Sequence, residues 1–328
     1  MSTVLSTRAL ALPMLVVSAM LTAGCTAAAA PDATPTSDPT PAAVAASPAP
    51  ADIPTHWSAV VDLAAIPLGD DAVSSAPATD FIFSCKTNFS GRGPVHTGPW
   101  IDYENDTWNS TTKVVVTGNI TWPTATYVES VEGEQRVLTS QDVPVDDPTG
   151  TFPIAADDPA FAFDRNPNSI GDHAVELRMP LNPTTAAVPS CVAMGAIGMI
   201  TNGVFIYNAL DGSGGDAAAH EAQDLCNGHP DGADDYHYHD IPSCILDVLA
   251  PTGSTLVGYA LDGYGIYVER DSLGNLPTNA DLDECHGRTS TVLFNGIEQE
   301  MYHYSATLEF PFTVGCYRGT PGPVPSHG

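Results

Sequence analysis

Basic side chains are scarce in this sequence. It contains 10 lysine and arginine residues against 39 aspartate and glutamate residues, and its formal net charge at pH 7 is −29. Only Lys86 and Lys113 are lysines. Binding to nucleic acid or to an anionic membrane surface requires a basic patch that neutralises phosphates, so this composition argues against both as partners. An acidic surface also favours solubility in general, and it identifies no substrate.

Long apolar segments are also scarce. Residues 9–21 form an apolar run that is too short to remain in a bilayer as a spanning helix. Arg8 precedes this run, and the small residues 22–24 separate it from Cys25, which resembles a bacterial lipobox. We therefore predict that residues 1–24 are a lipoprotein signal peptide. Cys25 would carry the lipid that anchors the exported chain to the outside of the cell membrane. The alternative is ordinary secretion, with Cys25 incidental.

Composition divides the rest of the chain. Residues 25–56 are mostly alanine, proline, threonine, serine and aspartate, with few side chains to bury, which predicts a disordered tether. Residues 57–318 are numerous enough for one large domain or two small ones. Residues 319–328 are rich in glycine and proline, and we predict a loose tail.

One stretch of the sequence occurs twice. Residues 198–207 resemble residues 258–267, and each stretch is followed by the same landmarks in the same order. The landmarks are a cysteine between an acidic residue and a glycine, then Tyr-His-Tyr, then a second cysteine. Because repeated units tend to pack against each other, we predict an internal duplication with copies at 198–244 and 258–316.

The cysteines are typical of disulfides rather than of a metal site. No C-x-x-C motif is present, and an even number of cysteines remains once Cys25 is set aside. An even count in an exported chain predicts disulfides, although six cysteines allow 15 pairings. Equivalent pairing in the two copies would give Cys226–Cys244 and Cys285–Cys316, leaving Cys85–Cys191 to tie the front of the domain to its core.

Strand signals dominate the domain. Residues 112–122 and 174–179 are rich in β-branched or alternating side chains, and 192–207 and 256–268 are apolar runs interrupted by glycine. The pairs Asn202-Gly203 and Asp262-Gly263 predict tight hairpin turns within the last two runs.

One helix is predicted over residues 216–225. Asp216 is a suitable N-cap, and the helical period would place His220 and Asp224 on one face. The fold class that we expect is mainly β, a sandwich or barrel-like arrangement with one short helix, stapled by disulfides.

The sequence Tyr236-His237-Tyr238-His239 carries the strongest chemical signal. Side chains alternate along a strand, so both histidines would lie on one face and both tyrosines would pack on the other. Two imidazoles on one strand can bind one metal ion, Zn²⁺ or Cu²⁺. The turn-forming residues 230–235 would fold His229 back beside the pair.

The second copy has fewer histidines. It keeps His303, but Arg288 matches His229 and Ser305 matches His239. We therefore expect one site, mainly in the first copy, with His303 and Asp262 as possible further ligands. The alternative is that the histidines pack and form hydrogen bonds without any ion.

These motifs resemble the YHYH domain family of exported bacterial proteins. The resemblance rests on Cys226-Asn227-Gly228-His229-Pro230 together with residues 236–239, and it extends through 258–263, 281–285 and 310–316. It implies little about activity.

Two other functions stay open. An open coordination position would allow a metal-dependent hydrolase that acts on an ester, an amide or a phosphate, with Glu221 or Asp224 as the base. Alternatively, the domain is a non-enzymatic binding module for a surface glycan or another protein, with its tyrosines and Trp100, Trp108 and Trp122 in contact with the partner.

Overall fold

The structure is a computed structural model that describes residues 53–90, 93–94 and 96–323. The chain divides into two units, and all described residues belong to the second unit, Ser47–Gly328. The predicted signal peptide, Cys25 and most of the predicted tether lie outside the described residues. None of the helices in the described part of the chain has the length and apolar character needed to cross a membrane.

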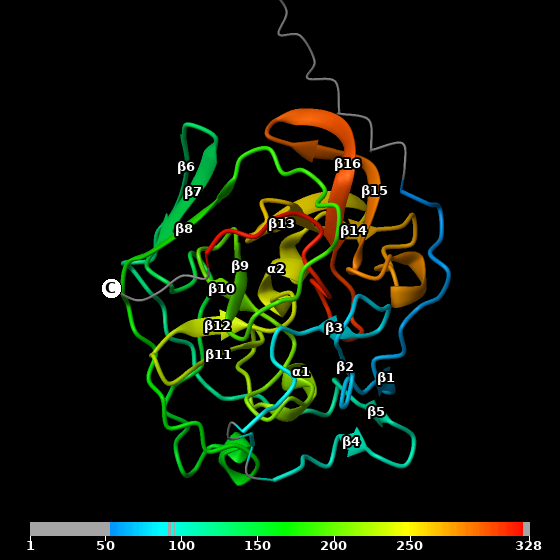
Figure 1. The fold of residues 1–328 in the computed structure, drawn as a ribbon. Helices are drawn as coiled ribbons and strands as arrows, with labels where there is room; N and C mark the ends of the chain where they lie inside the picture. The colour runs from blue at the N-terminus through cyan, green and yellow to red at the C-terminus, as the bar shows by residue number, and fades with distance from the viewer. Residues whose placement is uncertain (1–52, 91–92, 95, 324–328) are drawn as a thin grey trace, which may run out of the picture. The chain divides into compact units, whose positions relative to one another are not determined.

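An eight-stranded mixed sheet forms the centre of this unit (Figure 1). Its spatial order is β11-β12-β10-β9-β13-β14-β16-β15. The strands are β9 (Ala196–Ile200), β10 (Phe205–Tyr207), β11 (Gly228–Pro230), β12 (Tyr236–Tyr238), β13 (Gly253–Ala260), β14 (Gly265–Arg270), β15 (Gly287–Phe294) and β16 (Ile297–Ser305).

The strand order is symmetric about the antiparallel pair β9–β13. On one side β9 pairs antiparallel with β10, β10 pairs parallel with β12, and β12 pairs antiparallel with β11. On the other side β13, β14, β16 and β15 repeat these three pairings in the same directions. The two halves of the sheet therefore carry the two stretches that resemble each other in sequence.

Both predicted hairpin turns are confirmed. Residues 201–204 connect β9 to β10, and residues 261–264 connect β13 to β14. Gly203 and Gly263 have φ values of +91° and +88°, a region that L side chains rarely adopt. A Cβ atom on Gly263 would lie 2.3 Å from the carbonyl oxygen of Pro180, so close approach also requires glycine there.

Smaller sheets surround the central one. A three-stranded sheet in the order β6-β7-β8 confirms the strand predicted at 174–179, but residues 112–122 form only the isolated bridges Val116↔Asp224 and Ile120↔Thr149. The remaining strands are β1 (Ile66–Pro67), β2 (Val73–Ser74), β3 (Ile82–Phe83), β4 (Ile101–Asp102), β5 (Thr107–Trp108), β6 (Tyr127–Glu132), β7 (Gln135–Ser140) and β8 (Val175–Pro180).

The prediction of a helix over residues 216–225 is wrong, because the helix in the structure is shorter. Asp216 caps it as expected, but α1 (Ala217–His220) ends after one turn and Glu221 is extended. The carboxylate of Asp224 accepts hydrogen bonds from the backbone N–H groups of Gly150, Cys226 and Gly228, and such bonds compete with helix formation. His220 and Asp224 therefore do not share a helical face.

Helix is rare in the described part of the chain. Besides α1, it contains α2 (Ser243–Val248) and two 3₁₀ segments, η1 (Pro159–Ala162) and η2 (Asn279–Asp281). The fold is mainly β, as predicted, with two short α-helices instead of one.

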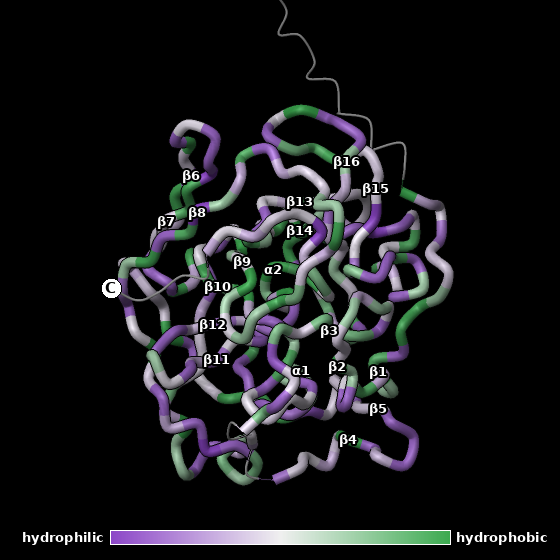
Figure 2. Tube along the Cα trace, in the orientation of Figure 1, coloured by the Kyte–Doolittle hydropathy of each residue, from purple (hydrophilic) through white to green (hydrophobic). Residues whose placement is uncertain are grey.

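The hydrophobic core lies against the central strands. All five residues of β9 are buried, as expected for a continuous apolar run, and the tube in Figure 2 is most hydrophobic along β9 and neighbouring central segments. Trp100 and Trp108 belong to this core, with 4% and 5% of their surface exposed, and Trp122 is half-buried. The prediction that tryptophans contact a partner is therefore wrong for Trp100 and Trp108.

All three predicted disulfides are present: Cys85–Cys191, Cys226–Cys244 and Cys285–Cys316. Cys226 and Cys285 each stand two residues before an edge strand, β11 and β15, and each pairs with the second cysteine of its own copy, as the repeated landmarks predicted. Residues 319–323 of the predicted loose tail are held in place, because Gly319 and Gly322 donate backbone hydrogen bonds to Asp262 and Leu261. The rest of that tail lies outside the described residues.

Candidate metal centre

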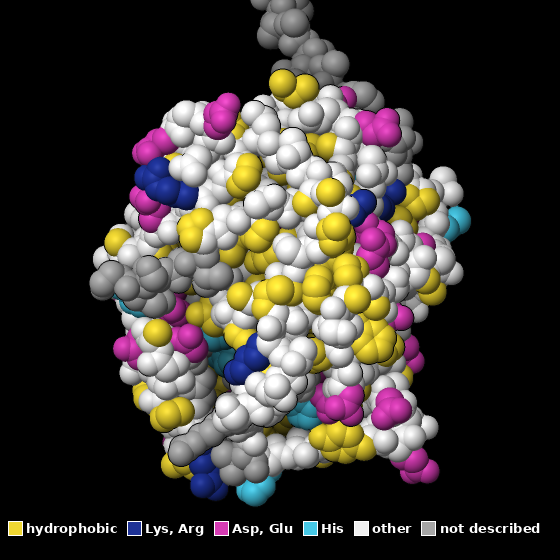
Figure 3. Space-filling view, in the orientation of Figure 1, with side chains coloured by type: hydrophobic (Ala, Val, Ile, Leu, Met, Phe, Trp, Pro, Cys, Tyr) yellow, Lys and Arg dark blue, Asp and Glu magenta, His cyan; other side chains and the backbone are white. Residues whose placement is uncertain are grey.

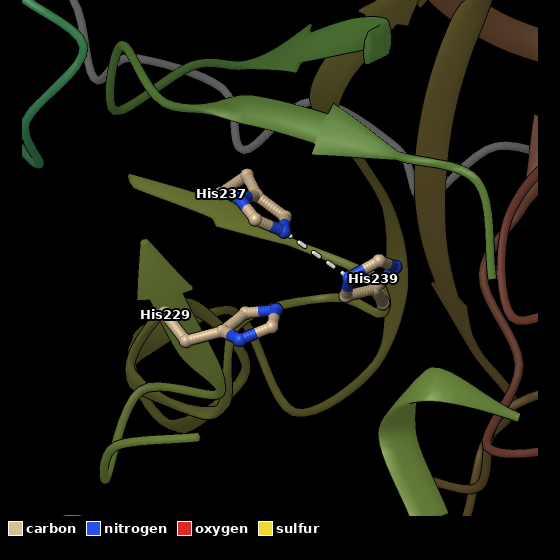
Figure 4. A group of neighbouring side chains, drawn as sticks. All are labelled: His229, His237 and His239. Atoms are coloured by element: carbon tan, nitrogen blue, oxygen red, sulfur yellow. Dashed lines mark hydrogen bonds between the residues drawn. The ribbon is translucent and has the colours of Figure 1, made fainter. Parts of the chain in front are cut away.

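Three imidazoles meet beside the edge strand β11. His237 lies on β12, His239 directly follows β12, and His229 on β11 pairs with His237 across the antiparallel ladder. Figure 4 shows the three rings directed into one shared space. The prediction that His237 and His239 share a face and that the turn at 230–235 returns His229 to them is confirmed.

The ring nitrogens are close enough to share one ion. The Nε2 atoms of His237 and His239 are 3.2 Å apart, and one ring nitrogen from each histidine lies within 4.8 Å of those of the other two. His229, His237 and His239 expose only 4%, 2% and 3% of their surface. On the opposite face of β12, Tyr236 and Tyr238 are fully buried, as predicted.

Glu221 brings a carboxylate to the same point. Its Oε2 atom lies 3.2 Å from the Nε2 atom of His229 and 3.2 Å from that of His239. Neither the Glu221 Oε2 nor the His229 Nε2 has a hydrogen-bond partner of acceptable geometry among the described residues. Both atoms are buried polar atoms that face the cluster, which is the arrangement expected of ligand atoms.

The backbone fixes the tautomers of two of the histidines. The Nδ1 atom of His237 lies 3.1 Å from the carbonyl oxygen of Asp235, and that of His239 lies 2.5 Å from the carbonyl oxygen of Asn208. A carbonyl oxygen can only accept, so each Nδ1 atom carries the proton. In the neutral rings both Nε2 atoms then present lone pairs to each other, and metal-binding histidines are commonly oriented by such bonds.

The titration behaviour of the cluster follows from burial and mutual contact. Burial, reinforced by His229 and His239, holds the pKa of His237 well below its usual value. Burial alone would raise the pKa of Glu221, but the adjacent imidazoles of His229 and His239 outweigh it and hold that pKa well below the usual value. Burial lowers the pKa of His239, but its contact with Glu221 raises it more. The cluster therefore combines an anionic carboxylate with an uncharged His237.

Neighbouring residues hold the cluster in shape. The Tyr207 ring at the end of β10 stacks on the His237 ring, with centroids 3.8 Å apart and 16° between the planes. The Cys226–Cys244 disulfide closes the segment that carries all three histidines. Tyr207 was not predicted at the site. The signal for it was available, because Tyr207 ends the repeated stretch.

A cavity of about 700 Å³ opens onto the cluster. Its lining includes Tyr207, Glu221 and the three histidines, together with Asn168, Met194 and Asp231. Figure 3 shows a hollow on this face in which histidine side chains are visible, while basic side chains are few and scattered over the surface. The volume is within the range of small-molecule sites.

Three other candidate residues lie away from the cluster. The carboxylate of Asp262 accepts hydrogen bonds from the hydroxyl of Tyr304 at 2.6 Å and from the backbone of Gly319 at 2.8 Å. The Nε2 atom of His303 lies 3.2 Å from Glu269 in the other half of the sheet. Asp224 accepts a hydrogen bond from the Tyr236 hydroxyl at 2.8 Å and organises backbone turns, so it is not placed as a base.

The equivalent position in the second half holds an ion pair. The Arg288 guanidinium donates to both carboxylate oxygens of Glu269, at 3.0 and 2.9 Å. Ser305 also donates to Glu269, which exposes none of its surface. Burial would raise the pKa of Glu269, but the adjacent imidazole of His303 and the hydrogen bonds from Arg288 lower it to about 2.

Comparison with known families finds one relationship. Residues 176–279 match the sequence model of the family described as YHYH protein. The match includes the histidine cluster, Glu221 and the β13–β14 hairpin, and it ends before β15 and β16. No curated protein and no solved structure matches the chain.

Proposed function

We propose that this chain, which carries a YHYH domain at residues 176–279, binds one transition-metal ion through His229, His237 and His239, with Glu221 as the fourth ligand. The observation that carries the proposal is the 3.2 Å approach of two Nε2 atoms whose rings both donate Nδ1–H to backbone carbonyls. Two facing lone pairs at this distance repel each other unless a cation, or a proton on one of the two Nε2 atoms, lies between them, and a bound metal ion meets this need for all three imidazoles and Glu221 together.

The ligand types favour Zn²⁺ or Cu²⁺. Imidazole suits both ions, and three histidines with one carboxylate complete a four-coordinate zinc site. Glu221 is equally distant from His229 and His239, which supports a role as ligand over a role as base. A fully coordinated ion is typical of binding or structural sites, whereas catalytic zinc keeps an open position.

Metal analysis tests the proposal directly. Protein purified without an affinity tag should contain about one equivalent of Zn or Cu by elemental analysis. The His237→Ala, His239→Ala double variant should lose the ion, whereas His56→Ala, at an exposed histidine outside the cluster, should retain it. A wild-type protein that neither retains Zn or Cu nor gains thermal stability when either ion is added would contradict the proposal.

The second candidate is a metal-dependent hydrolase. The cavity of about 700 Å³ above the cluster favours it, because a purely structural ion needs no space for a substrate. In that case a bound ion would activate water, and Glu221 would act as base rather than ligand. Glu221→Gln separates the two functions: loss of metal affinity indicates a ligand, whereas retained metal with loss of hydrolysis on an ester, amide and phosphate panel indicates a base.

We also propose that the chain is exported and anchored through a lipid on Cys25. Three disulfides in the domain support an oxidising compartment. Growth with a radiolabelled fatty acid should label the wild-type protein, and Cys25→Ala should abolish the label. Unlabelled wild-type protein in the culture medium would instead indicate ordinary secretion.

A further inference from the structure

A second group of potential metal ligands lies next to the Tyr207 hydroxyl. Asp142, His173 and Asp235 each offer one ligand atom, and these atoms lie within 4.8 Å of one another. Asp142 and Asp235 are buried, with 0% and 1% of their surface exposed. The Nε2 atom of His173 lies 2.7 Å from a carboxylate oxygen of Asp235. None of these residues belongs to the three-histidine cluster.

One oxygen in this group has no partner. The Oδ2 atom of Asp142 is buried and receives no hydrogen bond from any donor among the described residues. The carboxyl group lies beside that of Asp235, and its Oδ1 atom only approaches the backbone N–H of Phe205 at 3.4 Å. An unpaired carboxylate oxygen at full burial is costly unless a cation or a proton satisfies it.

The surrounding charge is negative. Burial and the neighbouring carboxylates of Asp235 and Asp231 raise the pKa of Asp142 well above its usual value. The hydroxyl of Tyr207 donates to Asp231 at 3.0 Å and to Asp235 at 3.4 Å, but a neutral hydroxyl brings no countercharge. A single histidine therefore faces several carboxylates.

We propose that Asp142, His173 and Asp235 bind a second divalent cation of the oxygen-preferring class, with Mn²⁺ as the best match. Two carboxylates and one imidazole suit Mn²⁺ better than Ca²⁺, which prefers six to eight oxygen ligands, or Cu²⁺, which prefers nitrogen ligands. The His173 side chain is 33% exposed, which provides an entry path and room for water ligands.

The two sites are distinct but adjacent. Asp235 contributes its carboxylate to the second group, and its backbone carbonyl accepts the Nδ1–H of His237. The Tyr207 ring stacks on His237, while its hydroxyl contacts Asp235. The domain would thus hold a nitrogen-rich site on and beside β12 and an oxygen-rich site that meets it at Asp235, the residue before that strand.

Titration of Mn²⁺ followed by electron paramagnetic resonance tests the second site. Tag-free protein is first loaded with one equivalent of Zn²⁺, which fills the three-histidine site, and is then titrated with Mn²⁺; the loss of the free Mn²⁺ signal measures binding. Wild type should bind about one equivalent, and the isosteric Asp142→Asn should weaken binding by about tenfold or more. Asp146→Asn is the matched control, because Asp146 is exposed and outside the group. It should bind like wild type.

A further variant separates this proposal from the three-histidine site. His229→Asn lies on β11 and should lose Zn²⁺ while retaining Mn²⁺. His173→Gln, at a half-exposed position, repeats the test if Asp142→Asn does not fold. Wild-type protein that binds no Mn²⁺ at millimolar concentration, or Asp142→Asn and His173→Gln variants with unchanged affinity, would overturn the proposal.

Discussion

Arg288 pairs with His303 across β15 and β16 in the same way that His229 pairs with His237 across β11 and β12. Arg288 and His229 occupy equivalent positions in the symmetric strand order. The Arg288 side chain is always positively charged, whereas the His229 imidazole can be neutral. Arg288 is bound to the buried carboxylate of Glu269. In the second half of the sheet, the Arg288 guanidinium thus supplies the positive charge beside the carboxylate. In the first half, a bound ion would have to supply it.

Replacing Arg288 by methionine should destabilise the domain strongly. The substitution leaves the fully buried Glu269 without its guanidinium partner, although His303 and Ser305 remain. We expect the free energy of unfolding to fall by about 3 kcal/mol. This is the lower end of the range for breaking a buried ion pair, because 19% of the Arg288 side chain is exposed. Urea denaturation measures it.

The double variant Arg288→Met, Glu269→Gln is the control for this prediction. It removes both charges, so it should recover a large part of the loss. A double variant as unstable as the sum of the two single variants would show that the two side chains act independently.

The contribution of Glu269 to the free energy of unfolding should depend on pH. Its pKa is lowered from 4.5 to about 2, so the folded state prefers the carboxylate form. The stabilisation is fully present above the unfolded-state pKa near 4.5 and is lost as the pH falls toward 2. A shift of this size corresponds to roughly 3 kcal/mol.

Comparison of wild type with Glu269→Gln by urea denaturation between pH 7 and pH 3 measures this effect. The difference in unfolding free energy should be constant above about pH 5 and should shrink below it. A difference that stays constant across the whole range would contradict the assigned role of Glu269.

Removal of the Cys226–Cys244 disulfide should affect stability and metal binding together. The bridge spans 18 residues, and Cys226→Ala, Cys244→Ala should lower the free energy of unfolding by about 3 kcal/mol. Because the bridge closes the segment that carries His229, His237 and His239, the affinity for Zn²⁺ measured by calorimetry should also fall.

The Cys285–Cys316 disulfide in the other half provides the matched control. It spans 31 residues, so its removal should cost a similar amount of stability. Zn²⁺ affinity of the folded variant should stay close to that of wild type. Equal loss of affinity in both variants would mean that the bridge acts only through global stability.

Tyr207 should support the metal site through its ring. Tyr207→Leu removes the stacking on His237, and we expect Zn²⁺ affinity to fall by about tenfold, as for other residues that orient metal ligands. Tyr207→Phe keeps the ring and loses only the hydroxyl contacts with Asp231 and Asp235, so it should bind Zn²⁺ like wild type. Similar Zn²⁺ affinity for the leucine and phenylalanine variants would refute this role.

The histidine cluster was predictable because its signals are local. Alternation along a strand places His237 and His239 on one face whatever the rest of the fold, and the turn residues at 230–235 return His229 to them. The repeated landmarks likewise suggested the cysteine pairs that the structure contains. Glu221 was considered only as a base, because its place beside the histidines depends on the early end of α1, which composition does not reveal.

Long-range contacts account for the other failures. Residues 112–122 have the composition of a strand but pair only through isolated bridges. Their partners, Asp224 and Thr149, do not belong to strands, so no continuous ladder forms. The grouping of Asp142 with His173 and Asp235 brings together residues from three distant segments. No spacing rule predicts such a group, since each residue alone is typical of a surface loop.

The Trp57 indole lies against Arg288, with the guanidinium 5.2 Å from the ring centroid, and its N–H donates to the carbonyl oxygen of Asn275 at 3.0 Å. The described chain therefore enters the domain beside β15, whereas the histidine cluster lies next to β11, the other edge of the eight-stranded sheet (Figure 1). The contacts of the Trp57 side chain therefore support the ion-paired half of the sheet rather than the half that carries the imidazoles.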